Sequence, residues 1–213
     1  MPHAAPLEAA RVRVVALGDS TTAGTPGFRS PLEAPPAGSG NPESQYGYWI
    51  EKKHPEWKIL NRGVNGETSG RILARFERDV LAAKPRALVV LAGVNDLYQG
   101  LAEEILRRNL DAIYEKAARA GIPVVACSIL PYNIETSEVR QKMNRMNDWI
   151  RAEAASRGMV FCDTARAVEG SPGMLAGTPD GLHPDVSGYR KMGEVITPAL
   201  EQILKSRKRA KRP

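Results

Sequence analysis

Ser20, Asp180 and His183 are residues of the three types that together form a nucleophilic triad. Ser20 ends the string Gly18-Asp19-Ser20 after an apolar run, and the other two stand in Asp180-Gly181-Leu182-His183 near the end of the chain. A serine hydroxyl is a weak nucleophile until a neighbouring base removes its proton. Because a triad is defined by roles and geometry, its order along the chain differs between folds. The order serine, aspartate, histidine is therefore compatible with acyl-transfer chemistry.

The chain has only three histidines, so the base can be found by elimination. His3 stands in a terminus that we expect to be frayed. His54 precedes Pro55 on a turn into a predicted strand, at the opposite edge of the sheet from Ser20. His183 lies between a glycine-containing turn and Pro184, where its backbone is restricted. We therefore predict that His183 is the base and that Asp180 accepts its Nδ1 proton and fixes its tautomer.

A tetrahedral intermediate also needs preorganised donors for its oxyanion. The backbone N–H of Ser20 is one candidate. Gly66 is a second, because a residue without a Cβ lets a substrate oxygen approach the backbone. Asn95, in the string Gly93-Val94-Asn95-Asp96, has a side-chain NH₂ donor. We expect Asp19 and Asp96 to hold loops by local hydrogen bonds.

Short β-branched runs alternate with longer helical patterns along the 213 residues. This alternation predicts an α/β fold, a three-layer α/β/α sandwich with about five parallel strands joined by right-handed crossovers. The predicted strands are 12–17, 58–60, 87–91, 124–129 and 159–162. The predicted helices are 46–53, 70–83, 102–120, 137–157 and 186–205.

The candidate residues follow the carboxyl ends of these strands. Gly18–Ser20, Gly66 and Gly93–Asp96 come after the first three strands, and Asp180–His183 comes after the last one. Open α/β sheets bind their ligands at that edge. Residues far apart in sequence are therefore expected to meet in one crevice.

Four blocks of the chain resemble those of the SGNH/GDSL hydrolases. They are Gly18-Asp19-Ser20, Gly66 within Asn61-Arg62-Gly63-Val64-Asn65-Gly66-Glu67-Thr68, Gly93-Val94-Asn95-Asp96, and Asp180-Gly181-Leu182-His183. The blocks occur in order and span nearly the whole chain, with Thr21 where the family name has leucine. The resemblance implies a flavodoxin-like fold and esterase, lipase or thioesterase chemistry. It also implies a Ser20–Asp180–His183 triad and an oxyanion hole formed by Ser20, Gly66 and Asn95.

The substrate pocket should be built by loops at the same edge, including a Pro- and Gly-rich insert at 25–44. We expect it to be lined by Phe28, Leu97, Tyr98, Pro131 and Tyr132. A small-molecule ester with a short acyl group is the first hypothesis. A lysophospholipase or thioesterase, with the insert as an apolar lid, is the second. A non-catalytic flavodoxin-like binding protein is the third.

Composition bounds the remaining expectations. The net charge of +6 comes from six Lys and Arg residues after Leu204, so we predict one domain over 1–204 and a basic, disordered tail over 205–213. A basic tail without a reading motif gives no reason to expect specific nucleic-acid binding. The sequence shows no secretory signal and no apolar run long enough to span a bilayer, which favours a cytoplasmic location. Asp180, His183 and Asp185 could form part of a metal loop, but we expect no metal and no cofactor, and buried roles for Cys127 and Cys162.

Overall fold

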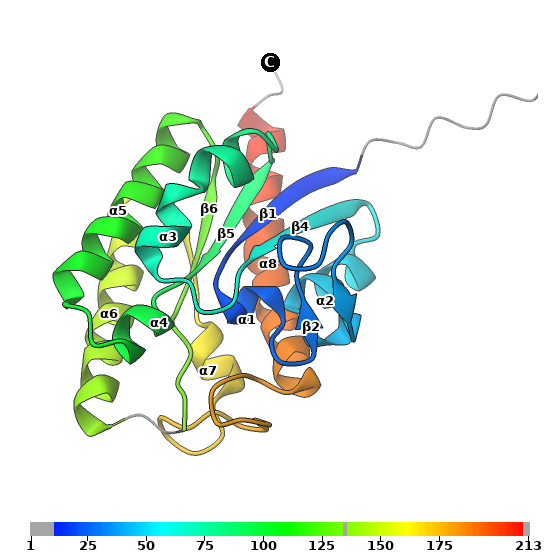
Figure 1. Ribbon diagram of the computed structural model, residues 1–213. Coiled ribbons are helices and arrows are strands. Elements are labelled where there is room, and N and C mark those ends of the chain that lie inside the picture. Colours follow the sequence, from blue (N-terminus) through cyan, green and yellow to red (C-terminus); the bar gives the residue numbers. More distant parts are fainter. Residues whose placement is uncertain (1–10, 134–135, 211–213) are drawn as a thin grey trace, which may run out of the picture.

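The computed structural model describes residues 11–133 and 136–210 and centres on a parallel sheet (Figure 1). Its strand order is β4-β1-β5-β6-β7. This is the 2-1-3-4-5 order of the flavodoxin-like fold, so the predicted fold is confirmed. The strands are β1 (Val12–Gly18), β4 (Trp57–Gly63), β5 (Ala87–Leu91), β6 (Val124–Cys127) and β7 (Val160–Cys162).

Helices cover both faces of the sheet, which gives the three-layer sandwich. Helices α3 (Ser69–Ala74), α4 (Val94–Tyr98), α5 (Glu103–Arg119) and α6 (Ser137–Ser156) contribute to the core on one face. Helices α2 (Tyr46–Lys53), α7 (Thr164–Val168) and α8 (Val186–Ala210) contribute to the core on the other. The short helix α1 (Ser20–Ala23) begins directly after β1 and Asp19.

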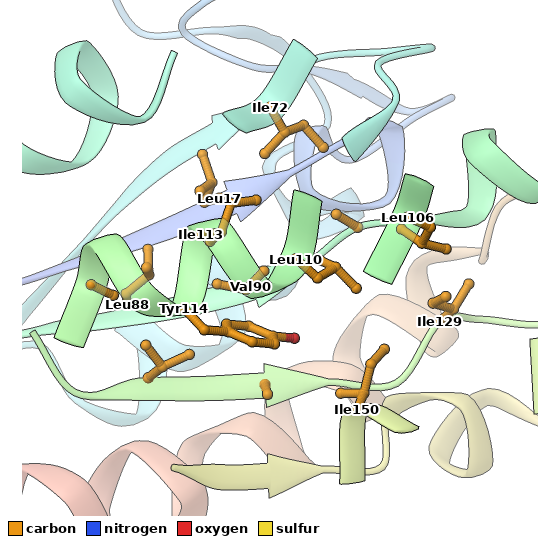
Figure 2. Close-up of a cluster of buried hydrophobic side chains, with 14 of the residues drawn as sticks. Leu17, Ile72, Leu88, Val90, Leu106, Leu110, Ile113, Tyr114, Ile129 and Ile150 are labelled. Carbon is orange, nitrogen blue, oxygen red and sulfur yellow. The ribbon is translucent and has the colours of Figure 1, made fainter. Parts of the chain in front are cut away.

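The two cores follow from the alternation of side chains along buried strands. Leu17 and Val90 point to the face covered by α5 and pack with Leu110 and Ile113 (Figure 2). Their neighbours along the strands, such as Ala16, face the core that α2 and α8 close. Parallel strands buried on both faces read as continuous apolar runs, which is why these strands could be predicted.

Some predicted boundaries differ from the observed ones. The run at 124–129 ends as a strand at Cys127, and the run at 58–60 extends to Trp57–Gly63. The predicted helix at 70–83 is two pieces, α3 and a π-helical turn η2 (Glu77–Leu81), separated near Arg75. Cys127 and Cys162 are free and buried, as predicted.

The insert at 25–44 is an ordered part of the structure. It contains a small antiparallel pair, β2 (Phe28–Arg29) and β3 (Ser39–Gly40), and a 3₁₀ turn η1 (Pro42–Ser44). Ser30 Oγ donates to the Gly63 carbonyl at 2.6 Å, and Glu33 Oε1 accepts from Asn65 N–H at 2.9 Å. These bonds attach the insert to the end of β4.

The C-terminal tail begins as helix. α8 runs to Ala210, so the prediction of disorder from residue 205 is wrong up to that point, and residues 211–213 and His3 lie outside the described residues. Lys, Arg and Ala are good helix formers and extend a helix whose apolar face is already packed. Across 11–133 and 136–210, we find no helix with the length and apolar character that crossing a membrane requires.

Candidate active site

Ser20 is held at the end of β1 by a tight turn. Gly18 precedes it where any side chain would collide, because an added Cβ would lie 2.2 Å from the Leu91 carbonyl oxygen. Asp19 caps α1, since its Oδ1 accepts from Thr21 N–H at 3.0 Å and from Thr21 Oγ1 at 2.7 Å. The predicted loop-holding role of Asp19 is thereby confirmed, and Ser20 is the first residue of α1.

The structure brings Ser20, His183 and Asp180 into one chain of hydrogen bonds. His183 Nε2 lies 2.9 Å from Ser20 Oγ, and His183 Nδ1 lies 2.7 Å from Asp180 Oδ2. An ionised carboxylate can only accept, so Nδ1 carries the proton and Nε2 of a neutral ring is free to accept from the serine hydroxyl. Residues 163 positions apart thus meet in the geometry of a nucleophile, a base and an orienting acid.

Asp180 is kept ionised by the turn that carries it. Burial alone raises its pKa, but hydrogen bonds from the His183 ring and from the backbone N–H groups of Leu182 and His183 outweigh burial and lower it. The two backbone bonds reach Oδ1 at 2.9 and 2.8 Å. The same carboxylate therefore orients the imidazole and closes the turn.

Neighbouring loops fix this turn in place. Asn133 N–H donates to the Gly181 carbonyl at 2.7 Å. Asp185 Oδ1 accepts from Gly188 N–H at 2.8 Å in the first turn of α8. Asp185, considered above as a metal ligand, thus caps a helix. Among the described residues, no three His, Cys, Asp or Glu side chains are grouped as metal ligands would be.

The three predicted oxyanion donors also lie on this edge of the sheet. The Ser20 N–H is in the first turn of α1 and has no intrahelical acceptor. Gly66 has φ +75°, a conformation that favours glycine, and no acceptor in the described part of the chain takes its N–H. Asn95 Nδ2 donates to the Glu67 carbonyl at 2.9 Å, which commits one of its two N–H bonds and leaves the other.

Asp96 holds the Asn95 segment against α3. Its carboxylate accepts from Ser69 N–H at 2.8 Å and from Ser69 Oγ at 2.5 Å. Burial raises the pKa of Asp96, and the Ser69 bonds oppose that shift. The role of Asp96 in holding a loop is confirmed.

The family model of the GDSL-like lipase/acylhydrolase family matches residues 16–191. The chain belongs to this family. The sequence resemblance to the SGNH/GDSL hydrolases is confirmed, and the protein is a hydrolase of this type.

Individual relatives of this GDSL-type hydrolase include named esterases. Esterase TesA of Pseudomonas aeruginosa is 27% identical over 150 residues, which cover 70% of this chain and 72% of that protein. An acetylxylan esterase of Geobacillus stearothermophilus is 29% identical over 159 residues, 66% of this chain and 71% of that one. The crystal structure of a GDSL-like lipase from Bacteroides thetaiotaomicron superposes with a TM-score of 0.72 at 26% identity, covering 93% of this chain and 92% of that one.

The residues predicted to line the substrate pocket differ in their exposure to solvent. Tyr98 is 56% exposed and meets the Tyr132 ring edge-on at a centroid distance of 5.9 Å. Leu97 and Tyr132 belong to the hydrophobic core, and Phe28 is buried against Gly38 of the insert. The prediction that these residues line the substrate pocket therefore stays a prediction, with Tyr98 the most exposed of them.

Two features account for these differences. On a helical turn, adjacent residues point in different directions, which explains why Leu97 is buried and Tyr98 is exposed. Pro131 is buried and lines a polar cavity of about 530 Å³ between α6 and α7, together with Asn144 and Asp163. Its place in that cavity does not test the prediction that it contacts substrate.

The sequence did not reveal the buried ionic group next to the segment that carries Gly66. Arg75 is buried and bonds to Glu67 and Asp79. In the sequence an arginine within a helical pattern reads as a surface residue, because Arg is almost never fully buried unless it is paired. The sign of this ionic group in the sequence was that Glu67 lies inside the block around Gly66.

Proposed function

We propose that this GDSL-type hydrolase is a serine esterase for carboxylic esters with short acyl groups. Ser20 is the nucleophile, His183 the general base and acid, and Asp180 the residue that orients His183. The observation that carries the proposal is the continuous hydrogen-bonded chain from Ser20 Oγ through both ring nitrogens of His183 to Asp180.

The reaction then has two halves. Ser20 Oγ attacks the ester carbonyl carbon while His183 Nε2 takes the hydroxyl proton, and the carbonyl oxygen becomes an oxyanion that accepts from the N–H groups of Ser20, Gly66 and Asn95. The C–O bond to the alcohol breaks, and His183 gives its proton to that alcohol. Water, deprotonated by His183 Nε2, next attacks the acyl carbon to form a second tetrahedral intermediate. When this intermediate collapses, the bond from the acyl carbon to Ser20 Oγ breaks, His183 gives its proton to Ser20 Oγ, and the acid leaves.

Two observations favour a short acyl group over the long chains of a lysophospholipase or thioesterase. Leu97, an apolar side chain that could have extended an acyl channel, is buried in the hydrophobic core. The insert is tied to Gly63 and Asn65 by hydrogen bonds instead of forming an apolar flap. Of the two relatives, the acetylxylan esterase is named for a short acyl group, and the name of Esterase TesA says only that it is an esterase.

The test is hydrolysis of p-nitrophenyl esters from acetate to decanoate, alongside acetylated sugars, with Ser20→Ala as the blank. We expect acetate and butyrate to be turned over best, and Ser20→Ala to lose at least about 10⁴-fold in kcat while its circular dichroism and melting temperature stay close to wild type. Turnover that rises with chain length would favour the lysophospholipase or thioesterase. Ser20→Ala with undiminished turnover would refute the triad. An inactive wild type that a fluorophosphonate does not label at Ser20 would favour a binding protein.

A further inference from the structure

Arg75 is a buried guanidinium whose donors meet acceptors on three different segments of the chain. Its Nε lies 2.6 Å from Glu67 Oε2, its Nη1 lies 2.7 Å from Asp79 Oδ2, and its Nη2 donates to the Gly18 carbonyl at 2.7 Å. The residue is 7% exposed. All three nitrogens of the planar fork are therefore occupied at short distances.

Two of the three partners of Arg75, Gly18 and Glu67, belong to the segments that carry the proposed oxyanion donors. Gly18 ends β1 two residues before Ser20. Glu67 directly follows Gly66, and the carbonyl oxygen of the same Glu67 accepts from Asn95 Nδ2 at 2.9 Å. One guanidinium thus connects the turn of the nucleophile to the loop on which both other donors depend.

Stability alone gives little reason for such an arrangement. Replacing a buried ion pair by apolar side chains of similar volume is often neutral or stabilising. A planar guanidinium instead fixes the relative positions of its acceptors, because its donors point in set directions. Asp79 completes the group, since it is also held by the exposed Arg78, whose Nε lies 2.7 Å from Asp79 Oδ1.

We propose that Arg75 is a positioning residue for ester hydrolysis, which sets the spacing between Ser20 and the Gly66 and Asn95 donors. This inference rests on the function proposed above. Oxyanion donors act on the transition state and hardly at all on the bound ester. Loosening the group therefore lowers kcat and leaves KM nearly unchanged.

The chain offers a matched control for this proposal. Arg75→Lys and Arg78→Lys change the same side-chain type on the same carboxylate, Asp79, but only Arg75 reaches Gly18 and Glu67. An ammonium is a point charge on a flexible stem and cannot span three acceptors in fixed directions. With p-nitrophenyl acetate we expect Arg75→Lys to lose about 10- to 100-fold in kcat with KM within about twofold, and Arg78→Lys to keep kcat within about twofold.

A second readout separates positioning from general loosening of the fold. If Arg75 acts through the oxyanion hole, Arg75→Lys should cost far less in an Asn95→Ala background than in wild type. Independent, multiplicative losses would show a merely structural role and overturn the proposal, as would equal kcat values for the Arg75 and Arg78 variants. Recovery of Arg75→Ala by added guanidinium chloride at non-denaturing concentrations would support it.

Folding and activity controls keep the outcomes distinct. If thermal melting shows that the Arg75 variants do not fold, Glu67→Gln, which keeps the volume and removes the charge facing Arg75, takes their place in the same comparison with Asn95→Ala. Wild type that hydrolyses no ester and is not labelled at Ser20 would remove the proposed function and this inference with it. Active wild type with no kcat loss in Glu67→Gln and Arg75→Lys would remove this inference alone.

Discussion

The buried carboxyl group of Asp19 should control how the stability of this protein depends on pH. It is 1% exposed, its Oδ1 accepts both bonds from Thr21, and its Oδ2 has no hydrogen-bond partner among the described residues. Burial raises the pKa of Asp19 to about 6, against the opposing effects of Thr21 and of the nearby His183 ring. Asp19→Asn removes the titration and keeps the oxygen that caps α1.

The sign of this pH dependence follows from the pH at which Asp19 loses its proton in the folded and in the unfolded state. Between the ordinary value of 3.8 and about 6, the folded protein binds a proton that the unfolded chain has lost, so the free energy of unfolding falls as pH rises. Below that window the group contributes no penalty, and above it the penalty is constant. At about 1.4 kcal/mol for each pKa unit, moving from 3.8 to about 6 destabilises the ionised fold by about 3 kcal/mol. About 2 kcal/mol of that change falls between about pH 4.5 and 7.5.

This pH-dependent change in the free energy of unfolding can be measured directly by urea unfolding. Tryptophan fluorescence would follow the unfolding at half-unit steps from about pH 4.5 to 7.5. The stability of Asp19→Asn relative to wild type should rise by about 2 kcal/mol across that range. The opposite sign serves as a control in Asp180→Asn. The pKa of Asp180 is lowered in the fold, so its carboxylate contributes stability above the unfolded pKa that is lost as pH falls.

The comparison uses only the change with pH, because the new amide also changes the free energy of unfolding by an amount that does not depend on pH. If the unfolding free energies of wild type and Asp19→Asn run parallel within about 0.5 kcal/mol, the buried carboxyl is not titrating in the fold and the reasoning from its burial is wrong. A difference that grows toward low pH would mean that Asp19 is stabilised as a carboxylate.

Three further predictions concern catalysis and packing. Asp180→Asn should lower kcat for p-nitrophenyl acetate by about 10³- to 10⁴-fold, because the amide holds the wrong tautomer of His183; a loss below about tenfold would contradict the orienting role. Asn95→Ala should lower kcat by about 10²- to 10³-fold with little change in KM, whereas a rise in KM alone would place Asn95 in ground-state binding. Ile113→Ala, in the core of α5, should lower the free energy of unfolding by about 2–5 kcal/mol. On the same helix the exposed Ile105→Ala should change it by less than about 0.5 kcal/mol, and equal effects would contradict the described core.

The strands themselves and the edge of the sheet where the chemical groups meet were predictable from local patterns, whereas the flavodoxin-like fold was implied by the family resemblance. The strands are apolar on both faces, and the carboxyl ends of parallel strands share one edge. Ser20 and Asn95 each follow such a strand closely, and His183 follows β7 after α7 and a loop, so their convergence follows from topology. Gly66 was predictable for a local reason as well, since its left-handed backbone suits glycine.

The direction of single side chains could not be predicted in this way. Leu97 turns into the core and Tyr98 to the surface, because tertiary packing selects which side of a short helix is buried. The burial of Arg75 depends on acceptors from Gly18 and Glu67, residues 57 and 8 positions away. The order of the insert depends likewise on Gly63 and Asn65, outside the insert itself. Contacts of this kind leave no periodic signal in the sequence.

The parts of the site reach Ser20 from opposite faces of the sheet. Asp96 and Arg75 hold the segments of the proposed oxyanion donors on the side of α3 and α4, whose residues Ile72 and Leu97 belong to one hydrophobic core. His183 is held at the start of α8, which packs into the other core, and Tyr189 of that helix donates to the Thr25 carbonyl at 2.6 Å. Because the two cores are separated by the sheet, loosening one should affect mainly the stabilisation of the oxyanion and loosening the other mainly proton transfer. Catalysis at Ser20 requires both the stabilisation of the oxyanion and proton transfer, so it depends on the packing of both cores.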